Sequence, residues 1–144
     1  MTLDSHVACF NKVLELVVTV WPAISNNIVV GRMYAEPDAR PWLLLHHSYE
    51  FSEEHSTIKS AQLVNRFDIV GRLDATAGTT AFTTITDLQS DILSTLAGFD
   101  WSSLGGFLSQ PFSIDMEPLG VPDSGTSQVL TFSVGWQVST LEDR

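Results

Sequence analysis

The residues best suited to chemistry lie between positions 46 and 55, where histidines and glutamates gather: His46, His47, Glu50, Glu53, Glu54 and His55. Imidazole nitrogens and carboxylate oxygens are common ligands of zinc. Adjacent residues of a strand point to opposite faces, so His46 and His47 cannot chelate one ion together. His46 and Glu50 share a face, but a third ligand would have to come from a hairpin tip. We therefore expect solvated strand and hairpin residues here, and no metal site.

Other reactive groups also have plain structural interpretations. Cys9 lies in an apolar helical pattern, which predicts a small buried side chain and not an exposed, reactive thiol. The carboxylate pairs on the strand near residue 115 and the helix near residue 90 both look solvated, whereas acid–base catalysis needs one buried carboxyl group. The chain has no phosphate-binding glycine loop and no Gly-x-Ser-x-Gly motif. We predict a protein that is not an enzyme, with no catalytic residues and no cofactor.

Composition narrows the class of protein. A chain of 144 residues with 44% apolar residues is expected to fold as one domain, residues 1–144. The single cysteine cannot form an internal disulfide, which favours a reducing compartment. No basic start precedes an apolar run, so we expect neither a signal peptide nor a membrane span, and a soluble intracellular product.

The charge balance is strongly acidic, with 17 Asp and Glu against 7 Lys and Arg, a net charge of −10. No cluster of Lys and Arg is present, which argues against tight binding to nucleic acid phosphates. Two interpretations remain open. The acidic surplus serves solubility, or it forms a surface that faces polyanions without adhering to them.

Hydrophobic periodicity predicts two helices. Residues 3–20 have helical spacing, and Pro22 ends the pattern. The apolar arc of this helix is wider than one sheet face needs, so either it is buried deep in its own domain or a second subunit covers part of it. A second helix follows residues 77–80, with Gly98 as its terminator. Its apolar face consists of Ile85, Leu88, Ile92 and Leu96.

Alternation predicts the strands. They span residues 42–51, 61–74, 111–117 and 128–138, and a short strand is possible at 28–33. One apolar row is Leu63, Phe67, Ile69 and Leu73, another is Leu130, Phe132, Val134, Trp136 and Val138, and a third is Phe112, Ile114 and Met116. The order of elements predicts an α+β fold, with a mostly antiparallel sheet of about four to five strands and two helices packed on it.

The polar face of the 61–74 strand is the strongest candidate for a contact surface. It carries Arg66, Asp68, Arg72 and Asp74 at steps of two or four residues. The planar guanidinium suits carboxylates that another surface presents. The alternative is pairing within the sheet with a neighbouring strand that carries Ser113, Asp115 and Glu117.

A loop at residues 99–110 is rich in aromatic and apolar residues, including Trp101 and Phe107. Two interpretations remain for it. The loop caps the core as one short turn, or it docks a partner, because exposed aromatic patches often mark interfaces.

The whole chain resembles the small tail terminator proteins of long-tailed bacteriophages. The matching features are a long first helix, a Glu-Pro-Asp-Ala-Arg-Pro run at 36–41 leading into a strand, a long strand with arginines on its polar face, a second helix and a final strand pair. The resemblance lies in length and element order, and the family offers no diagnostic motif. This chain departs from the more basic members of the family, since its only lysines are Lys12 and Lys59.

The resemblance implies a non-enzymatic virion protein at the junction of tail and neck, made in the host cytoplasm. Such proteins form a hexameric ring that caps the tail tube and joins it to the head–tail connector protein, while DNA passes through the lumen without specific binding. We expect the tip at 52–59, with Glu53 and Glu54, to block addition of further tube protein. The rival hypotheses are a connector or other minor tail protein, and a cytoplasmic ligand-binding module or small enzyme.

Overall fold

The computed structural model describes residues 4–31, 40–53, 56–57, 60–76, 79–123 and 127–143. Its elements, in chain order, are α1 (Asp4–Val20), the 3₁₀ turn η1 (Pro22–Ile24), β1 (Ile28–Val30), β2 (Trp42–Ser52), β3 (Ser60–Thr76), α2 (Thr79–Gly98), the 3₁₀ turn η2 (Trp101–Leu104), β4 (Gly106–Asp123) and β5 (Ser127–Asp143). The predicted α+β fold is confirmed.

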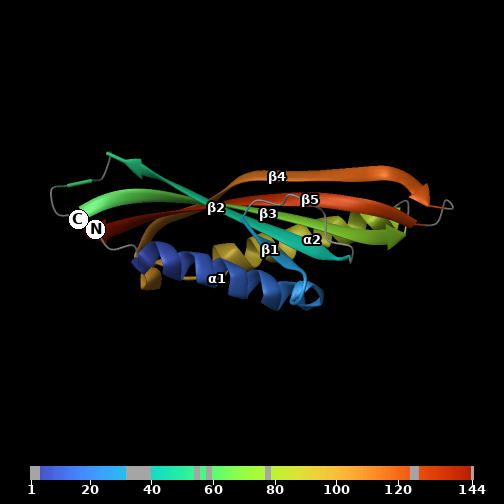
Figure 1. Ribbon diagram of the computed structural model, residues 1–144, viewed down its shortest axis with the longest axis horizontal. Coiled ribbons are helices and arrows are strands. Elements are labelled where there is room, and N and C mark those ends of the chain that lie inside the picture. The colour runs from blue at the N-terminus through green and yellow to red at the C-terminus, as the bar shows by residue number, and fades with distance from the viewer. Residues whose placement is uncertain are drawn as a thin grey trace.

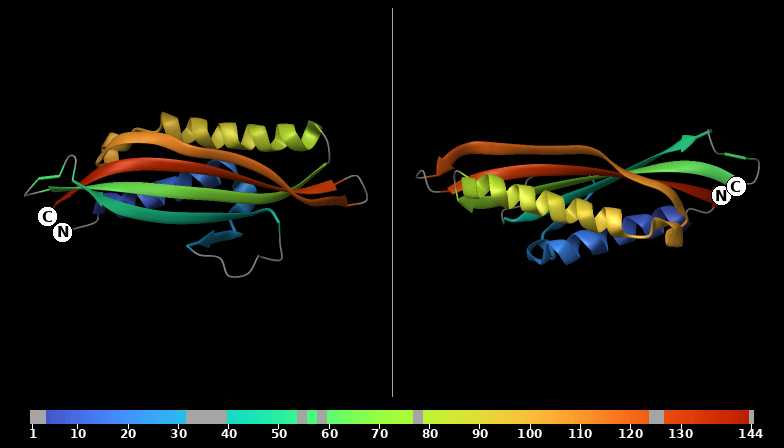
Figure 2. Two further views of the ribbon diagram at one scale, coloured as in Figure 1. Left: turned by 90° about the horizontal axis from the view of Figure 1, so that it is seen from above. Right: turned by 180° about the vertical axis from the view of Figure 1, so that it is seen from behind.

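The strands form one sheet in the order β1-β2-β3-β5-β4. The short β1 runs parallel to β2, and the other neighbours are antiparallel. Figure 1 shows α1 and α2 together on one side of the long, twisted sheet, with the two chain ends close to each other. The left view of Figure 2 looks onto the opposite side, where the strands lie in front of α1 and no helix covers them. We call these two sides the helix face and the open face.

The core lies between the helix face and the two helices, as the alternating rows predict. Leu45 of β2, Ile69 of β3 and Val134 of β5 are in register across three strands, and none of them is exposed. Strand side chains alternate between faces, so each row delivers its apolar residues to one side. All four predicted core residues of β3 and all five of β5 are buried.

The first helix is buried along one stripe of its wide apolar arc. Cys9, Val13 and Val17 have exposed fractions of 1% or less, whereas Val7 is 51% exposed. The second helix buries Ile85, Ile92 and Leu96 fully, as predicted, and ends at Gly98. The apolar arc of α1 therefore exceeds what its own domain covers. Neither described helix combines the length and hydropathy that a membrane span needs.

The last two strands are longer than the alternation predicts. β4 begins at Gly106, inside the segment expected to be an aromatic loop, and continues past Pro118. It pairs with the 17-residue β5 on one side only, and at a sheet edge a proline deprives no neighbouring strand of a hydrogen bond. The two strands extend to Asp123 and from Ser127, beyond the predicted bounds of 111–117 and 128–138.

Close packing at Gly71 leads to a stability prediction. A Cβ atom at this position would lie 2.5 Å from Phe132 and 2.8 Å from Trp21, both of which are buried. We expect Gly71→Ala to lower the free energy of unfolding by about 1–3 kcal/mol, because the added methyl group overpacks the core. Urea denaturation measures the change.

The matched control is Gly98→Ala, since nothing lies within 4 Å of a Cβ there. This substitution at the end of α2 should change the free energy of unfolding by less than about 1 kcal/mol. If both variants had the same stability as the native chain, the tight packing around Gly71 would be disproved.

Candidate functional site

The open face of the sheet carries the predicted contact residues of β3. Arg66, Asp68, Arg72 and Asp74 alternate with the buried apolar row, and their side chains are partly or fully exposed. The predicted common face is therefore confirmed. The described ion-pair partners of Arg66, Asp68 and Asp74 do not include Ser113 or Asp115 of the alternative pairing, because β5 lies between β3 and β4; the side chain of Glu117 lies outside the described residues.

Among the described residues, the charged partners on this face come from β2 and from the segment that leads into it. An Arg66 guanidinium nitrogen lies 3.4 Å from a Glu50 carboxylate oxygen, with side chains 48% and 60% exposed. His46 Nδ1 lies 3.8 Å from Asp68, and Arg40 Nε donates to Asp74 at 3.0 Å. Exposed pairs of this kind contribute about 0–1 kcal/mol to stability. Stability therefore does not explain the charges on this face.

The Arg72 side chain is held on the open face by a hydrogen bond and by an aromatic contact. Its Nε donates to the Thr131 hydroxyl oxygen at 3.2 Å, and its guanidinium carbon lies 5.5 Å from the ring centre of Trp42. The Trp42 side chain is only 2% exposed although it lies on the open face. Arg72 therefore covers an aromatic ring, as guanidinium groups commonly do.

A β-bulge on β4 brings an aromatic ring to the open face. The register shifts between Pro111 and Ser113, so Phe112 and Ser113 both lie against Gly135. Phe112 is 42% exposed, and the Arg66 guanidinium lies 5.9 Å from its ring centre. The prediction that Phe112 and Ile114 share one apolar face is wrong, because the extra residue of the bulge reverses the alternation.

The remaining predicted contact residues lie in different environments, one in the core and two on the surface. Trp101 is 4% exposed and donates its Nε1 hydrogen to the Leu96 carbonyl oxygen at 2.8 Å, so it caps the core. Phe107 is 45% exposed on the first residues of β4. Glu53 is exposed just after β2, and Glu54 lies outside the described residues.

Sequence reasoning missed a buried polar cluster on the helix face: His6, His47, Asn65, Thr140 and Glu142. Four of these side chains are 9% exposed or less. A signal for two members was present, because His47 and Asn65 occupy apolar rows of their strands. Polar residues at such positions need partners inside the protein.

The amide of Asn65 organises this cluster. Its Nδ2 donates to the Val138 carbonyl oxygen at 3.0 Å and to the Thr140 hydroxyl oxygen at 3.1 Å. Its Oδ1 is therefore the acceptor for His6 Nδ1 at 2.6 Å and for His47 Nε2 at 3.3 Å. Each imidazole thus carries a proton on the nitrogen that faces Asn65, and its other nitrogen is an acceptor while the ring is neutral.

The carboxylate of Glu142 joins the end of the chain to the start of α1. Its Oε1 accepts from the backbone nitrogen of His6 at 2.8 Å, in the first turn of the helix. Helix N-termini attract negative charge because their first N–H groups lack intrahelical partners. Burial, with the Glu142 charge second, raises the pKa of the Cys9 thiol to about 11. Cys9 is therefore an inert core residue, as predicted.

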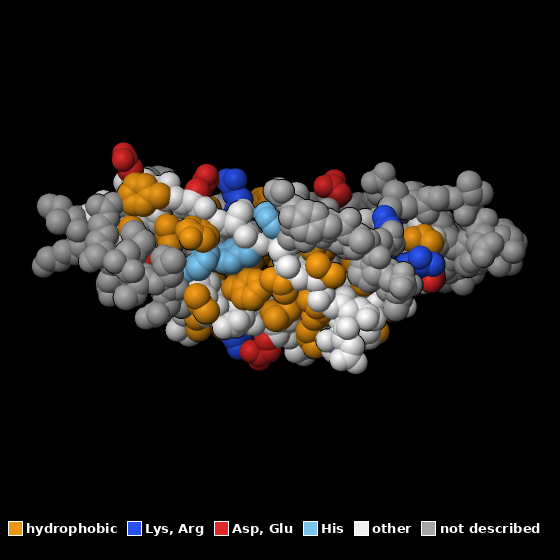
Figure 3. Space-filling model, in the orientation of Figure 1, with side chains coloured by type: hydrophobic (Ala, Val, Ile, Leu, Met, Phe, Trp, Pro, Cys, Tyr) orange, Lys and Arg blue, Asp and Glu red, His pale blue; other side chains and the backbone are white. Residues whose placement is uncertain are grey.

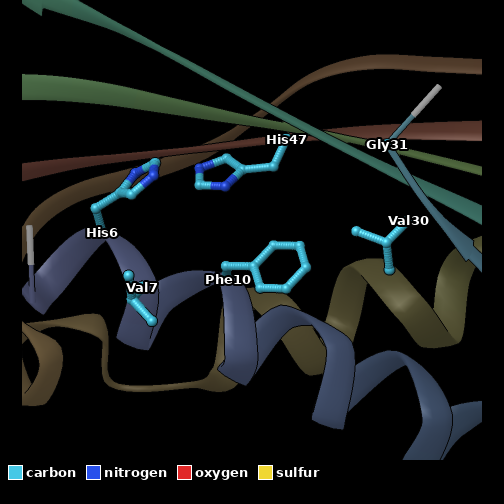
Figure 4. A pocket seen from close by; sticks show the side chains of 6 residues that line it. All are labelled: His6, Val7, Phe10, Val30, Gly31 and His47. Carbon is cyan, nitrogen blue, oxygen red and sulfur yellow. The ribbon is translucent and has the colours of Figure 1, made fainter.

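A groove of about 290 Å³ opens beside this cluster, between α1, β1 and β2. Its lining residues are His6, Val7, Phe10, Val30, Gly31 and His47. Figure 4 shows the His6 and His47 rings along one side, Phe10 below them and Val30 across the gap. The His47 ring stacks on His6 at 4.3 Å and on Phe67 at 4.4 Å between ring centres. The groove therefore offers apolar and aromatic surface with few polar atoms.

His46 and His47 lie on opposite faces of β2, as the alternation predicts. Within the described ranges, no group of three or more His, Cys, Asp or Glu residues is arranged to hold a metal ion. No family model matches the chain, and no curated protein matches it. Its function has to be inferred from its own surfaces.

The buried imidazole of His47 leads to a prediction about pH. Burial, with the nearby His6 second, lowers its pKa from 6.5 to about 4. The unfolded chain therefore binds more protons than the folded chain as the pH falls from about 6.5 to about 4, and stability is lost over this window. We expect up to about 1 kcal/mol of this loss per pH unit from His47, because solvent screens a part-buried ring.

The measurement is urea denaturation of the native chain and of His47→Gln at pH 7, 6 and 5. The variant should lose less stability between pH 7 and pH 5. His46→Gln is the matched control, since His46 lies on the exposed face of the same strand. Parallel pH profiles for all three proteins would contradict the prediction.

Proposed function

We propose that this protein is a structural, non-enzymatic ring subunit that ends the tail tube of a long-tailed bacteriophage and joins it to the head connector. The observation that carries the proposal is a long sheet with one face that neither α1 nor α2 covers and two edges beside which no further described strand lies. The resemblance in length and element order supplies the virion context and the hexameric count. The connector role within the same neck remains the alternative.

In the described part of the chain, no further strand lies beside the outer edges of the sheet. The short β1 pairs only with residues 43–45 of β2, so no described strand lies on that side of residues 46–52, whose other side pairs with β3. The outer edge of β4 likewise has none within the described ranges. Free edges present backbone N–H and C=O groups that can pair with another chain. Contacts between two different edges are heterologous, and they close a ring when the rotation per subunit permits.

Features of the same edges can also stop growth. Pro111 and Pro118 lie on β4, and its pairing with β5 shifts at three places. Prolines and bulges limit further strand pairing. Glu53 adds an exposed charge at the end of β2 that would be costly to bury without a partner. The ring therefore accepts specific neighbours and resists addition of another tube ring.

The acidic balance suits a ring through which DNA passes. At a net charge of −10, the chain gains nothing electrostatically from contact with phosphates. DNA then passes without adhering.

The groove beside His47 is the observation that favours a second candidate function, a small-ligand-binding module. A pocket lined jointly by Trp42, Tyr49 and Trp136 would have been stronger support for this function, but these residues do not share a pocket. Trp42 instead lies on the open face, whereas Tyr49 and Trp136 belong to the helix face. The groove itself is apolar and open beside α1 (Figure 4).

Arg66 tests the open face as a contact surface. Its pair with Glu50 is exposed, so Arg66→Glu should cost at most about 1 kcal/mol of stability. Losing one partner of a charge pair buried between subunits costs about 2–5 kcal/mol. We expect Arg66→Glu to weaken assembly at least tenfold with little change in melting temperature. Lys12→Glu is the control, since its partly exposed pair with Glu15 lies on α1, away from the open face. If Arg66→Glu assembled normally, Arg66 would interact only with residues of its own sheet, and its role in the subunit contact would be disproved.

The function itself is tested with purified tail tube protein. Tubes assembled without this protein should exceed their normal length, and adding it in excess should arrest growth at the head-proximal end. Electron microscopy gives the length distributions. If the distributions match with and without the protein while it still binds virions, it is a connector or minor structural protein.

A further inference from the structure

Two sets of exposed apolar side chains lie at opposite edges of the sheet. The first set lies around the groove: Val7 is 51% exposed, Val30 55%, Tyr49 50% and Phe51 47%. Figure 3 shows hydrophobic side chains gathered around pale-blue histidines on this side of the molecule. The second set is on β4, where Phe107 is 45%, Leu108 47% and Ile114 52% exposed. The strand order β1-β2-β3-β5-β4 separates the two sets by the width of the sheet.

The first set forms a concave surface. Val7 and Phe10 line the groove from α1, Val30 and Gly31 from the far side, and His47 closes it from β2. The lowered pKa keeps His47 neutral at physiological pH. An apolar side chain can therefore cover this ring without burying a charge. The groove adjoins the part of β2 whose edge has no described partner strand.

The second set protrudes from an edge strand. Ile114 is in register with Val134, so it belongs to the helix face, but β4 has no further described strand beside it. Its side chain therefore stands at the rim of the core and remains 52% exposed. When the β4 edge of one copy lies against the β1–β2 edge of the next, helix-face residues of β4 come next to the helix-face groove of the neighbour.

Charge separates the same two edges. Between Leu73 and Asp143 the sequence contains no Lys, Arg or His, and its exposed acids there include Asp87, Asp91 and Asp115. Every histidine and all Lys and Arg except Arg144 precede Leu73. The α2–β4 edge is thus purely anionic, whereas the chain's cations belong to the half built from α1, β1, β2 and β3. Residues 1–72 carry 8 acids against 6 Lys and Arg, whereas residues 73–144 carry 9 acids against Arg144 alone, so joining unlike edges causes less repulsion than joining two edges of the second half.

We infer that the groove between α1 and β2 of one copy receives the exposed Ile114 side chain of β4 from the next copy in the ring. This inference rests on the proposed ring and specifies which surfaces of two neighbouring copies meet in it. A second copy fits better than a foreign peptide, because the chain itself carries both the concave and the protruding surface. The contact joins unlike edges, as a closed ring requires.

The test uses Val7→Glu, which blocks the groove, and Ile114→Glu, which blocks the protrusion. Each variant alone should be monomeric, or associate at least tenfold more weakly than the native chain, in sedimentation velocity and light scattering after size exclusion. An equimolar mixture should form 1:1 dimers and stop there. One intact groove then meets one intact protrusion, while the other contact would bring two glutamates together.

The controls place the same substitution nearby but outside the proposed contact. Asn11→Glu is on an exposed position of α1, and Gln110→Glu is on the other face of β4. Both controls should assemble as the native chain does. Melting curves show that every variant is folded, which is expected because all four positions are exposed.

The outcomes separate this inference from the proposed function. If the native chain forms rings and either Val7→Glu or Ile114→Glu assembles like it, this contact is wrong and the ring remains. A mixture that stays monomeric, or grows beyond dimers, also contradicts the head-to-tail contact. If the native chain remains monomeric even with tube and connector proteins, the ring itself is excluded.

Discussion

The buried amide of Asn65 is the constraint on which the geometry depends. It lies in the middle of β3 and binds three neighbouring elements at once, through His6 of α1, His47 of β2 and the Val138 carbonyl of β5. A buried polar group that loses a partner costs about 1–3 kcal/mol, so the angle between α1 and the sheet is fixed by hydrogen bonds as well as by packing. The width of the groove beside α1 follows from that angle.

The two faces of the sheet have different physical roles. The helix face holds the core, and a change there costs stability because the packing is dense. The open face carries charged pairs in solvent that contribute little to folding, such as Arg66 with Glu50. Residues with little effect on stability are free to satisfy another requirement, such as complementarity to a neighbour. The same separation explains why the exposed apolar side chains concentrate at the strand edges and not over the core.

Periodicity predicted most of this fold, because rows such as Leu63 to Leu73 are local patterns. Periodicity failed where the position of a side chain depends on the neighbouring strand of the sheet. The bulge that turns Phe112 to the open face depends on β5, and so does the separation of Arg66 from Asp115. The candidate site was predicted only in part. The common face of the β3 charges follows from alternation, but the cluster around Asn65 joins residues far apart in sequence, and no spacing rule brings His6 to Glu142.

The position of β5 has a consequence for synthesis on the ribosome. This strand follows β1 to β4 in the sequence, yet it lies inside the sheet between β3 and β4, and its Glu142 holds the first turn of α1. Until β5 emerges, the nascent chain has two incomplete half-sheets and a helix without its carboxylate partner. The sheet is completed only after β5 emerges, with the slow kinetics of long-range strand pairing. A chain truncated before β5 lacks the strand that joins its two edges, so a prematurely terminated product cannot form the complete sheet.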